Sequence, residues 1–388
     1  RNNMKLEPPV NSNYAAVVVK VKTVNELPGL DNLRGTPLLG YQALVGREVE
    51  PDTVGIVFTA ETQLSEEFCR ENNLFRKAEL NADPTKTGYL EENRRVRAIK
   101  LRQQKSSALF MSLDSLSYTG VDVNDLKSGD TFDKLNGFDV CKKYVIREPK
   151  VGKQQPKKER RVEDKLFPAH FDTAQYWRNK DSIPDNAFIT VTQKLHGTSI
   201  RATNTLVKRK LTLLERIARK FGVKVNEFEY ANVYGSRRVV KDPNDPNQDH
   251  FYDFDLWTRE GAKLDGLIPK GFVIYGELIG FADDSPIQSG YTYQVPRGEA
   301  HLYVYRVTRV NDDGYVTDLS WQQVKEFCSL SGLRHVPELW SGYHKDFDPD
   351  VFMDIRYVDS GYVQAVPLDP GKTVDEGVCV RAEGLEPT

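Results

Sequence analysis

The segment TQKLHGTSIRA, residues 192–202, says most about how this chain folds and what it can do. It overlaps the end of FITVTQKL (188–195), an apolar and β-branched run that predicts a buried strand. Lys194 lies at the end of that strand, and Gly197 follows after the polar residue His196, which predicts a tight turn. A lysine that leaves a buried strand at such a turn is partly desolvated, and desolvation prepares a nucleophilic amine. The alternative is a solvated strand end without a chemical role, and this segment alone does not decide between the two.

Two glutamates interrupt later apolar strands. Glu277 lies inside IYGELIG (274–280), and Glu376 stands at the start of the strand in DEGVCVRAEG (375–384). Because a buried carboxylate is unstable without a partner, each glutamate belongs either to a structural ion pair or to an active site. Between Lys194 and these strands, a turn carries Ser236 and Arg237.

The surrounding residues mix strands with helices, which predicts an α+β domain over residues 166–388. HLYVYRVTRV (301–310) is a further apolar strand. LTLLERIARKFG (211–222) places apolar and basic residues on opposite sides of a helix, and we expect its apolar face to pack on the sheet rather than the helix to clamp nucleic acid. WQQVKEFCSLSGL (321–333) predicts a second helix, which ends at Gly332.

Residues 1–150 show a different pattern, with short strands and few helices. Apolar or alternating runs at 15–24, 44–50, 53–60, 94–102 and 106–113 predict five strands, and 65–73 predicts a short helix or turn. Five short strands suit a small all-β barrel, so we expect an OB-fold-like domain, with a β-sandwich as the alternative. The basic segment 151–165 predicts a solvated linker between the two domains.

The composition excludes several classes of protein. The chain has 54 basic and 56 acidic side chains, and its net charge of -2 predicts no strong overall affinity for nucleic acid, although such a sum can hide a basic face. No apolar stretch is long enough to span a bilayer, so we expect no membrane partner. The four cysteines form no CxxC pair, which argues against a zinc module and favours an intracellular location, cytoplasmic or nuclear. We expect a monomer.

Lys194, Glu277, Glu376 and their neighbours resemble the motifs of the covalent nucleotidyltransferase superfamily, which contains polynucleotide ligases and mRNA-capping enzymes. In that superfamily motif I is K-x-D-G, motif III contains Gly-Glu, motif IIIa carries an aromatic residue, and motif IV is E-G followed by two apolar residues. The matching segments, in the same order, are 194–197, 275–277, 303–305 and 376–378. The resemblance implies an α+β nucleotidyltransferase (ligase) domain, in which Lys194 forms a lysyl-AMP.

Within the superfamily the chain resembles ATP-dependent RNA ligases that carry an N-terminal OB module. Two short segments are similar to the corresponding segments of RNA ligases, namely GTS at 197–199 and the turn GSR at 235–237. Residues 1–193 precede the nucleophile, whereas capping enzymes and most DNA ligases place the OB domain after it. The resemblance implies that the cofactors are ATP and Mg²⁺ or Mn²⁺, and that the substrate is RNA with 3′-OH and 5′-phosphate ends, with nicks in duplex RNA as the expected target.

The resemblance also implies a role for each candidate residue. Lys194 is the nucleophile, and Arg237 neutralises phosphate. Glu376 and Glu277 hold the water shell of the metal, with contact to the ribose as the alternative for Glu277. Tyr305 stacks on adenine, with packing in the core as the alternative. The expected nucleotide-binding residues are Gln193, Lys194, Leu195, His196, Gly197, Ser236, Arg237, Glu277, Tyr305 and Glu376. The expected RNA-binding residues of the first domain lie on the predicted basic strand and are Arg94, Arg95, Arg97, Lys100 and Arg102, which would follow a phosphate backbone without recognising bases.

Two features depart from the family pattern. His196 occupies the place of the motif I aspartate, and motif V, K-x-K, is not visible before Thr388, so we expect the sequence to be truncated before that motif. Two alternatives therefore stay open. One is a DNA ligase or a GTP-using capping enzyme, and the other is a catalytically lapsed module that binds nucleotide or RNA.

Overall fold

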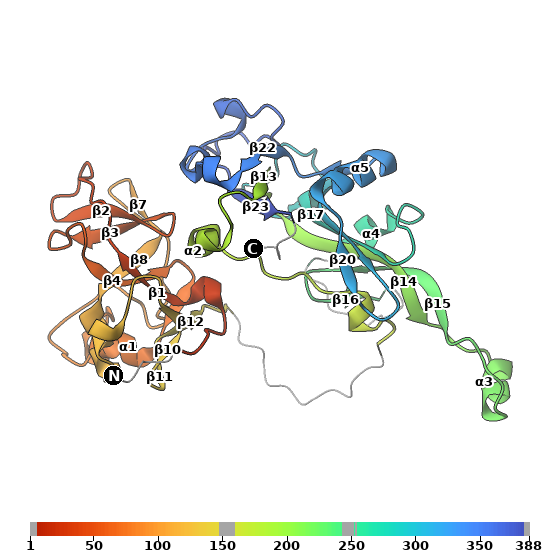
Figure 1. The fold of residues 1–388 in the computed structure, drawn as a ribbon, viewed down its shortest axis with the longest axis horizontal. Coiled ribbons are helices and arrows are strands. Elements are labelled where there is room, and N and C mark those ends of the chain that lie inside the picture. The colour runs from red at the N-terminus through yellow and green to blue at the C-terminus, as the bar shows by residue number, and fades with distance from the viewer. Residues whose placement is uncertain (1–5, 147–159, 243–251, 253, 384–388) are drawn as a thin grey trace. The chain divides into compact units, whose positions relative to one another are not determined.

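The structure is a computed structural model of the 388-residue chain, and it describes residues 6–146, 160–242, 252 and 254–383. The chain divides into two compact units (Figure 1). The first comprises Arg1–Gly152 and Ala174–Lys180, and the second comprises Lys153–Thr173 and Asp181–Thr388. Most of the linker expected at 151–165 lies outside the described residues.

The first unit is built around a six-stranded sheet with the order β2-β3-β8-β4-β1-β9. Its strands are β1 (Ala16–Lys20), β2 (Leu33–Leu38), β3 (Tyr41–Gly46), β4 (Val54–Thr59), β8 (Ala108–Ser112) and β9 (Thr131–Phe132). Three small hairpins or pairs accompany it, namely β5 (Thr62–Leu64) with β12 (Cys141–Lys143), β6 (Ile99–Leu101) with β7 (Gln104–Ser106), and β10 (Lys134–Leu135) with β11 (Phe138–Asp139). The strands predicted at 15–24, 44–50, 53–60 and 106–113 are confirmed, with shifted ends. An OB-fold arrangement of this unit stays a prediction.

A short helix, α1 (Glu66–Glu71), confirms the helix or turn predicted at 65–73. Its N-cap is Ser65, whose hydroxyl accepts a hydrogen bond from the Phe68 N–H at 3.0 Å. Phe68 is fully buried and meets Phe58 edge to face, with ring centroids 5.3 Å apart. These rings anchor the core of the unit, which also contains Val18, Ile56, Leu64, Leu116 and Phe132.

The prediction of a strand at 94–102 is wrong for most of that range. Only β6 is regular, and Arg94 and Arg102 at the two ends have φ angles of 57° and 45°, in the left-handed region. β6 pairs with β7 alone, and all three of its side chains are exposed. A two-stranded pair offers little apolar surface to pack on, so Ile99 and Leu101 stay exposed, whereas Val96, outside β6, is buried in the core of the unit.

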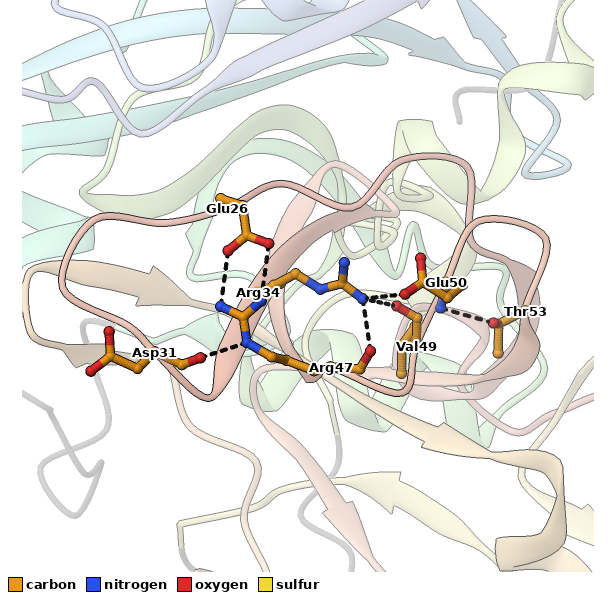
Figure 2. Close-up of polar contacts among 7 residues, drawn as sticks. All are labelled: Glu26, Asp31, Arg34, Arg47, Val49, Glu50 and Thr53. Carbon is orange, nitrogen blue, oxygen red and sulfur yellow. Dashed lines mark hydrogen bonds and ion pairs between the residues drawn. The ribbon is translucent and has the colours of Figure 1, made fainter.

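Two arginines tie the β2–β3 hairpin to the loops beside it (Figure 2). Arg34 donates hydrogen bonds to the carbonyls of Arg47 at 2.9 Å and Val49 at 2.7 Å, and to the carboxylate of Glu50 at 2.9 Å. Arg47 pairs with the carboxylate of Glu26 at 3.0 Å. Both guanidinium groups are therefore engaged within the first unit.

The second unit combines two sheets with helices, which confirms the predicted α+β class. The eight-stranded sheet has the order β16-β15-β14-β17-β19-β20, with β18 added to β17 and β21 added to β19. Its strands are β14 (Thr198–Lys208), β15 (Phe228–Gly235), β16 (Val240–Lys241), β17 (Phe272–Ala282), β18 (Ser285–Pro286), β19 (Ala300–Val310), β20 (Val316–Asp318) and β21 (Arg334–His335). The three-stranded sheet has the order β22-β13-β23, with strands β13 (Phe188–Gln193), β22 (Glu338–Tyr343) and β23 (Val378–Ala382).

Two helices pack on the strands of the large sheet. The predicted helix at 321–333 is confirmed as α5 (Trp321–Ser331), and Gly332 caps its end with a φ of 67°. Trp321 and Cys328 of α5 share a core with Val304 and Val307 of β19. α4 (Leu256–Ala262) packs against β14 and β17. α2 (Tyr176–Asn179) belongs to the first unit.

The helix predicted at 211–222 forms as α3 (Leu213–Lys220), but its apolar face does not pack on the sheet as expected. Figure 1 shows α3 at the far end of the hairpin made by β14 and β15. A capping box between Thr212 and Glu215 starts the helix, yet no residue of α3 is buried. Leu214 and Phe221 are 79% and 82% exposed. The expectation of a packed face is therefore wrong, because the hairpin carries the helix away from any sheet surface.

Short 3-10 helices complete the described elements: η1 (Ser12–Tyr14), η2 (Ala78–Leu80), η3 (Leu113–Thr119), η4 (Val123–Asp125), η5 (Asp164–Leu166), η6 (Lys180–Ser182), η7 (His344–Asp346), η8 (Pro349–Phe352) and η9 (Val358–Ser360). Among the described residues, none of the helices has the length and apolar character needed to cross a membrane.

Candidate active site

Pairing between two strands of the small sheet brings Lys194 to Glu376. β13 and β23 are antiparallel, with Gln193 opposite Val378. The Lys194 N–H donates a hydrogen bond to the Gly377 carbonyl at 2.9 Å, just beyond the paired residues. The Lys194 amine lies 3.1 Å from Oε1 of Glu376. Motifs I and IV, which are far apart in the sequence, therefore meet as an ion pair.

The turn after Lys194 is locked to the large sheet at Gly197. Its N–H donates a hydrogen bond to Oε1 of Glu277 at 3.0 Å, and Ser199 Oγ lies 3.5 Å from the other carboxylate oxygen. A Cβ atom added at Gly197 would lie 1.9 Å from the carbonyl oxygen of Leu278. Only glycine permits this approach of the turn to β17, and the approach places Glu277 beside motif I.

His196 shares the carboxylate of Glu376 with Lys194. Its Nδ1 lies 3.5 Å from Oε1 of Glu376, and its ring meets Tyr291 edge to face at 4.9 Å. The backbone N–H of His196 donates a hydrogen bond to the hydroxyl of Tyr293 at 2.8 Å. The residue in the place of the motif I aspartate therefore faces the same group as the predicted nucleophile.

The two glutamates have different electrostatic surroundings. Burial raises the pKa of Glu277 to about 7, and the nearby charge of Glu376 adds to that rise. Burial also acts to raise the pKa of Glu376, but the hydrogen bond from His196 and the charge of Lys194 outweigh it, so that pKa lies below its ordinary value. The pKa of His196 is raised, chiefly by the same hydrogen bond. At neutral pH, Glu376 is ionised and Glu277 is divided between its two forms.

The expected desolvation of Lys194 does not occur in this structure. Its side chain is 52% exposed and pairs with Glu376. A strand end that leads directly into a turn leaves the side chain at the sheet edge, so the apolar run before it does not enclose the amine. The amine is thus accessible to a substrate from solvent.

The neighbours of Lys194 on β13 and in the turn lie inside the protein. Leu195 is buried in the core, and Gln193 is almost fully buried. The Gln193 side chain donates hydrogen bonds to the Val366 carbonyl at 3.0 Å and to Asp375 at 3.1 Å, and accepts one from the Val366 N–H at 2.7 Å. The role of Gln193 and Leu195 as nucleotide contacts stays a prediction. Asp375, the residue directly before Glu376, was not predicted from the sequence, and its hydrogen bond with Gln193 joins motif IV to β13.

Tyr305 packs against two clusters of the core of the second unit, and the charges of Glu277 and Arg237 both act on its hydroxyl. Burial raises the pKa of its hydroxyl, the charge of Glu277 adds to that rise, and a hydrogen bond with Ser199 and the charge of Arg237 oppose it. Ser236 stabilises the turn after β15, since its hydroxyl accepts a hydrogen bond from the Val239 N–H at 3.3 Å. Arg237 forms an ion pair with Asp172, a residue that no sequence motif indicated.

The five basic residues expected to contact RNA in the first unit differ in whether their side chains already form hydrogen bonds or ion pairs within the protein. Arg94 donates a hydrogen bond to the Leu64 carbonyl at 2.8 Å, Arg95 pairs with Glu61 at 2.7 Å, and Arg102 donates to the Gly29 carbonyl at 3.1 Å. Arg97 and Lys100 are exposed, and no ion pair engages them among the described residues. Arg97 and Lys100 are therefore the stronger candidates of this set.

The site also shows where a metal ion could be held. Within residues 6–146, 160–242, 252 and 254–383, no group of three or more histidine, cysteine or acidic side chains forms a ready metal site. However, Oε2 of Glu376 is buried and has no hydrogen-bond partner among the described residues. A hard divalent cation with its water shell suits such a carboxylate oxygen.

An exposed strand-end lysine, two glutamates and a glycine-locked turn on an α+β fold define the covalent nucleotidyltransferase class. A family model described as RNA ligase matches residues 187–386, more than half of the chain, so the chain belongs to the RNA ligase family. The matched range contains Lys194, Glu277 and Glu376. The expected superfamily and the expected enzyme class are thereby confirmed.

The fold is similar to solved structures of an RNA ligase from Naegleria gruberi. The structure with PPi has 14% identity and a TM-score of 0.57, and the match covers 96% of this chain and 94% of that chain. A mutant solved with AMP and Mn has 13% identity and a TM-score of 0.56, over 95% and 93% of the two chains. A mutant solved with ATP and Mn has 14% identity and a TM-score of 0.57, and the match covers 95% of this chain and 93% of that chain. A search of curated proteins found no match.

Proposed function

We propose that this chain is an ATP-dependent RNA ligase that joins RNA 3′-OH and 5′-phosphate ends through a lysyl-AMP and an adenylylated RNA. The observation that carries the proposal is the Lys194–Glu376 pair at 3.1 Å, placed beside the Gly197–Glu277 contact within the range of the RNA ligase family. The Naegleria structures with ATP, AMP and PPi support it, because these are the substrate, the transferred group and the product of lysine adenylylation.

In the first step the Lys194 amine attacks the α-phosphorus of ATP. A nitrogen–phosphorus bond forms, the bond to the bridging oxygen breaks, and pyrophosphate leaves. The amine must give up a proton to attack, and the ionised Glu376 carboxylate lies within hydrogen-bond reach to accept it. The exposure of Lys194 allows ATP to approach from solvent.

Glu376 and Glu277 are the residues that would hold Mg²⁺ or Mn²⁺, because both are carboxylates at the nucleophile and Glu376 has a buried oxygen without a partner. The bound cation would supply positive charge that favours the neutral amine and neutralises the phosphates. The chain's own contribution is to fix the two carboxylates, one through β23 and the other through β17.

Two further steps complete the reaction. The 5′-phosphate of RNA attacks the AMP phosphorus, a phosphoanhydride bond forms, and Lys194 is released. A 3′-hydroxyl then attacks the activated 5′-phosphate and AMP leaves. Arg237 would stabilise the negative charge on phosphate, and Tyr305, whose hydroxyl is subject to the charges of both Glu277 and Arg237, would stack on adenine.

The proposal extends to the substrate. A nick in duplex RNA presents both ends together, and the first unit would hold the flanking RNA as an OB-like platform. Arg97 and Lys100 support this role, since both are exposed on or beside the β6–β7 hairpin. The protein would act as a monomer.

Labelling with radioactive nucleotide tests the proposal. ATP labelled at the α-phosphate should transfer label to the protein in the presence of Mg²⁺ or Mn²⁺, and α-labelled GTP should not. Label from GTP would indicate a capping enzyme. No label from either nucleotide would indicate a binding module without catalytic activity.

A further inference from the structure

The segment 352–366 lies against the small sheet and has a packed aromatic core of its own. Tyr357 is fully buried, and its ring meets those of Phe352 and Tyr362 with centroids 6.1 and 6.2 Å apart. The Gln364 side chain donates a hydrogen bond to a carbonyl of β22 at 2.8 Å. Because β22 is a neighbour of β13, the segment has a fixed position beside the strand that leads to the predicted nucleophile.

Gln193, the residue before Lys194, binds this segment through both ends of its side-chain amide. The amide nitrogen donates a hydrogen bond to the Val366 carbonyl at 3.0 Å, and the amide oxygen accepts one from the Val366 N–H at 2.7 Å. Gln193 is 1% exposed, so no water can take the place of these partners. The end of β13 is therefore held at one position relative to the 352–366 segment.

Asp375, the residue before Glu376, binds the same segment. One carboxylate oxygen accepts a hydrogen bond from the Tyr357 N–H at 2.8 Å, and the Asp375 N–H donates one to the Ile355 carbonyl at 2.9 Å. The other carboxylate oxygen accepts a hydrogen bond from the Gln193 side chain at 3.1 Å. Asp375 is 8% exposed, so a shift of the residue would leave buried polar groups without partners, which is costly.

The Lys194–Glu376 ion pair lies between two links that join the same two stretches of backbone. One link is the hydrogen bond between the side chains of Gln193 and Asp375, and the other runs from the Lys194 N–H to the Gly377 carbonyl at 2.9 Å. Glu376 is thus held through the residue before it and the residue after it. The distance of 3.1 Å between the Lys194 amine and the Glu376 carboxylate depends on both links.

We propose that Gln193 and Asp375 are positioning residues for lysine adenylylation, which hold the Glu376 carboxylate at the distance from the Lys194 amine that proton transfer needs. The inference rests on the proposed function, in which Lys194 attacks ATP and Glu376 accepts its proton. Proton transfer needs heavy atoms about 2.6–3.2 Å apart, so a small displacement of either strand removes the contact. Both residues act through Glu376, whereas a nucleotide contact by Gln193 would act on the binding of ATP.

A double-mutant cycle tests this proposal, because it separates an effect that passes through Glu376 from a general structural role. Asp375→Asn keeps the size of the side chain but replaces one accepting oxygen by a donating nitrogen, so either the Tyr357 N–H or the Gln193 amide loses its partner. The rate of lysyl-AMP formation is measured against ATP concentration for Asp375→Asn, for Glu376→Gln and for the double variant.

Asp375→Asn should lower the rate at saturating ATP about 10- to 100-fold and change the KM for ATP by less than about 2-fold, because the reacting groups are displaced while ATP still binds. In the Glu376→Gln protein the same substitution should cost less than about 3-fold, since no carboxylate is left to position. Equal losses in both proteins, or a wild-type rate for Asp375→Asn, would overturn the proposal.

Gln193→Met is the second variant, and it enters the same cycle if Asp375→Asn does not fold. It should lower the saturating rate in the same way. A higher KM for ATP with an unchanged saturating rate would instead make Gln193 a nucleotide contact and overturn its positioning role. The matched control is Asn81→Ala, because Asn81 is also buried and its side chain forms hydrogen bonds with the backbone of Phe75 in the first unit. Asn81→Ala should lower stability in urea without changing the rate of the folded protein.

Amide hydrogen exchange gives a readout that does not depend on catalysis. In Asp375→Asn and in Gln193→Met, peptides that cover 192–195 and 376–379 should exchange faster than in the wild type, and peptides of β15 should not change. Unchanged exchange in both variants would overturn the proposal. A wild-type protein that forms no lysyl-AMP would contradict the proposed function, and the exchange would still decide whether Gln193 and Asp375 hold the two strand ends together.

Discussion

The backbone N–H of Gly197 donates a hydrogen bond to Oε1 of Glu277 at 3.0 Å. This single contact joins the turn after the predicted nucleophile to β17 of the large sheet. On the other side, Lys194 reaches Glu376 through the pairing of β13 with β23. The site thus depends on two sheets that meet at one turn of four residues, 194–197.

Gly197→Ala should disrupt that junction. The added methyl group would lie 1.9 Å from the Leu278 carbonyl oxygen, so the turn must move away from Glu277. We expect a loss of about 1–3 kcal/mol in the free energy of unfolding, because overpacking forces the backbone to shift. Urea denaturation measures this loss, and labelling with ATP should fall with it. A variant with wild-type stability and labelling would show that the turn does not need its contact with β17.

Removal of either carboxylate should slow lysine adenylylation strongly. Glu277→Ala and Glu376→Ala should each reduce the rate of lysyl-AMP formation by about 100-fold or more, since each removes negative charge at the nucleophile and a metal-holding group. Glu299→Ala, which removes an exposed carboxylate paired with His301, is the control and should keep the wild-type rate. Rates within a few-fold of wild type for both site variants would make these acids structural.

Lysyl-AMP formation should increase as the pH rises through about 7. As the pH falls through about 7, Glu277 is protonated, because its pKa is raised to about 7. His196 takes up its proton at a higher pH than an ordinary imidazole, because its pKa is also raised, chiefly by the hydrogen bond to Glu376. The first change removes negative charge from the site, and the second adds a positive charge that repels a metal. His196→Asp should therefore retain more activity at acid pH, measured from about pH 5.5 to 8 with Mg²⁺ and with Mn²⁺.

We also expect Mn²⁺ to support the wild-type protein at least as well as Mg²⁺, since imidazole is a softer ligand than carboxylate. Identical pH and metal profiles for the two proteins would remove His196 from any role in tuning the site.

The apolar face of α3 should contribute little to stability. Leu214→Ala should change the free energy of unfolding by less than about 0.5 kcal/mol, because the side chain is already exposed. The matched variant Leu278→Ala should lose about 2–5 kcal/mol, because Leu278 is fully buried. Equal losses in urea denaturation would mean that another part of the protein covers α3 in solution.

Charge reversal at the β6–β7 hairpin should separate RNA binding from nucleotide chemistry. Arg97→Glu combined with Lys100→Glu should weaken the sealing of nicked duplex RNA and reduce its dependence on salt, while lysyl-AMP formation stays unchanged. Arg102→Ala is the control, because its guanidinium group is already engaged by the Gly29 carbonyl. Sealing at the wild-type rate by the charge-reversed protein would exclude this hairpin from the RNA surface.

The resemblance of the motifs to the superfamily implied that Lys194, Glu277 and Glu376 belong to one site, and the structure places Glu376 beside Lys194 and Glu277 beside the turn that follows it. The pairing of β13 with β23, which brings Lys194 and Glu376 together, was not predicted from the sequence. Asp172 could not be found from the motifs either, because the segment that contains it has no regular structure and no motif. Its position depends on hydrogen bonds from Arg201 and Tyr275, which are distant in the sequence.

The errors have physical causes too. The amphipathic pattern at 211–222 is the same for a helix whose apolar face is packed and for one whose apolar face is exposed to solvent. The sequence could therefore predict the helix but not the exposure of its apolar face. The alternation at 94–102 likewise predicts a strand only where a sheet is available to receive it. The first segment lies at the far end of the β14–β15 hairpin (Figure 1), and of the second only Ile99–Leu101 forms a strand, which pairs with β7 alone.

The mass of the intact protein after incubation with ATP and a divalent metal tests the central claim most directly. The wild-type protein should gain the mass of one AMP, and hydroxylamine or pyrophosphate should remove it, since the bond is a phosphoramidate at Lys194. The Lys194→Met variant should gain nothing, whereas Lys220→Met, which replaces an exposed lysine of α3, should behave like the wild type. An AMP adduct on the Lys194→Met variant, or none on the wild-type protein, would contradict the account.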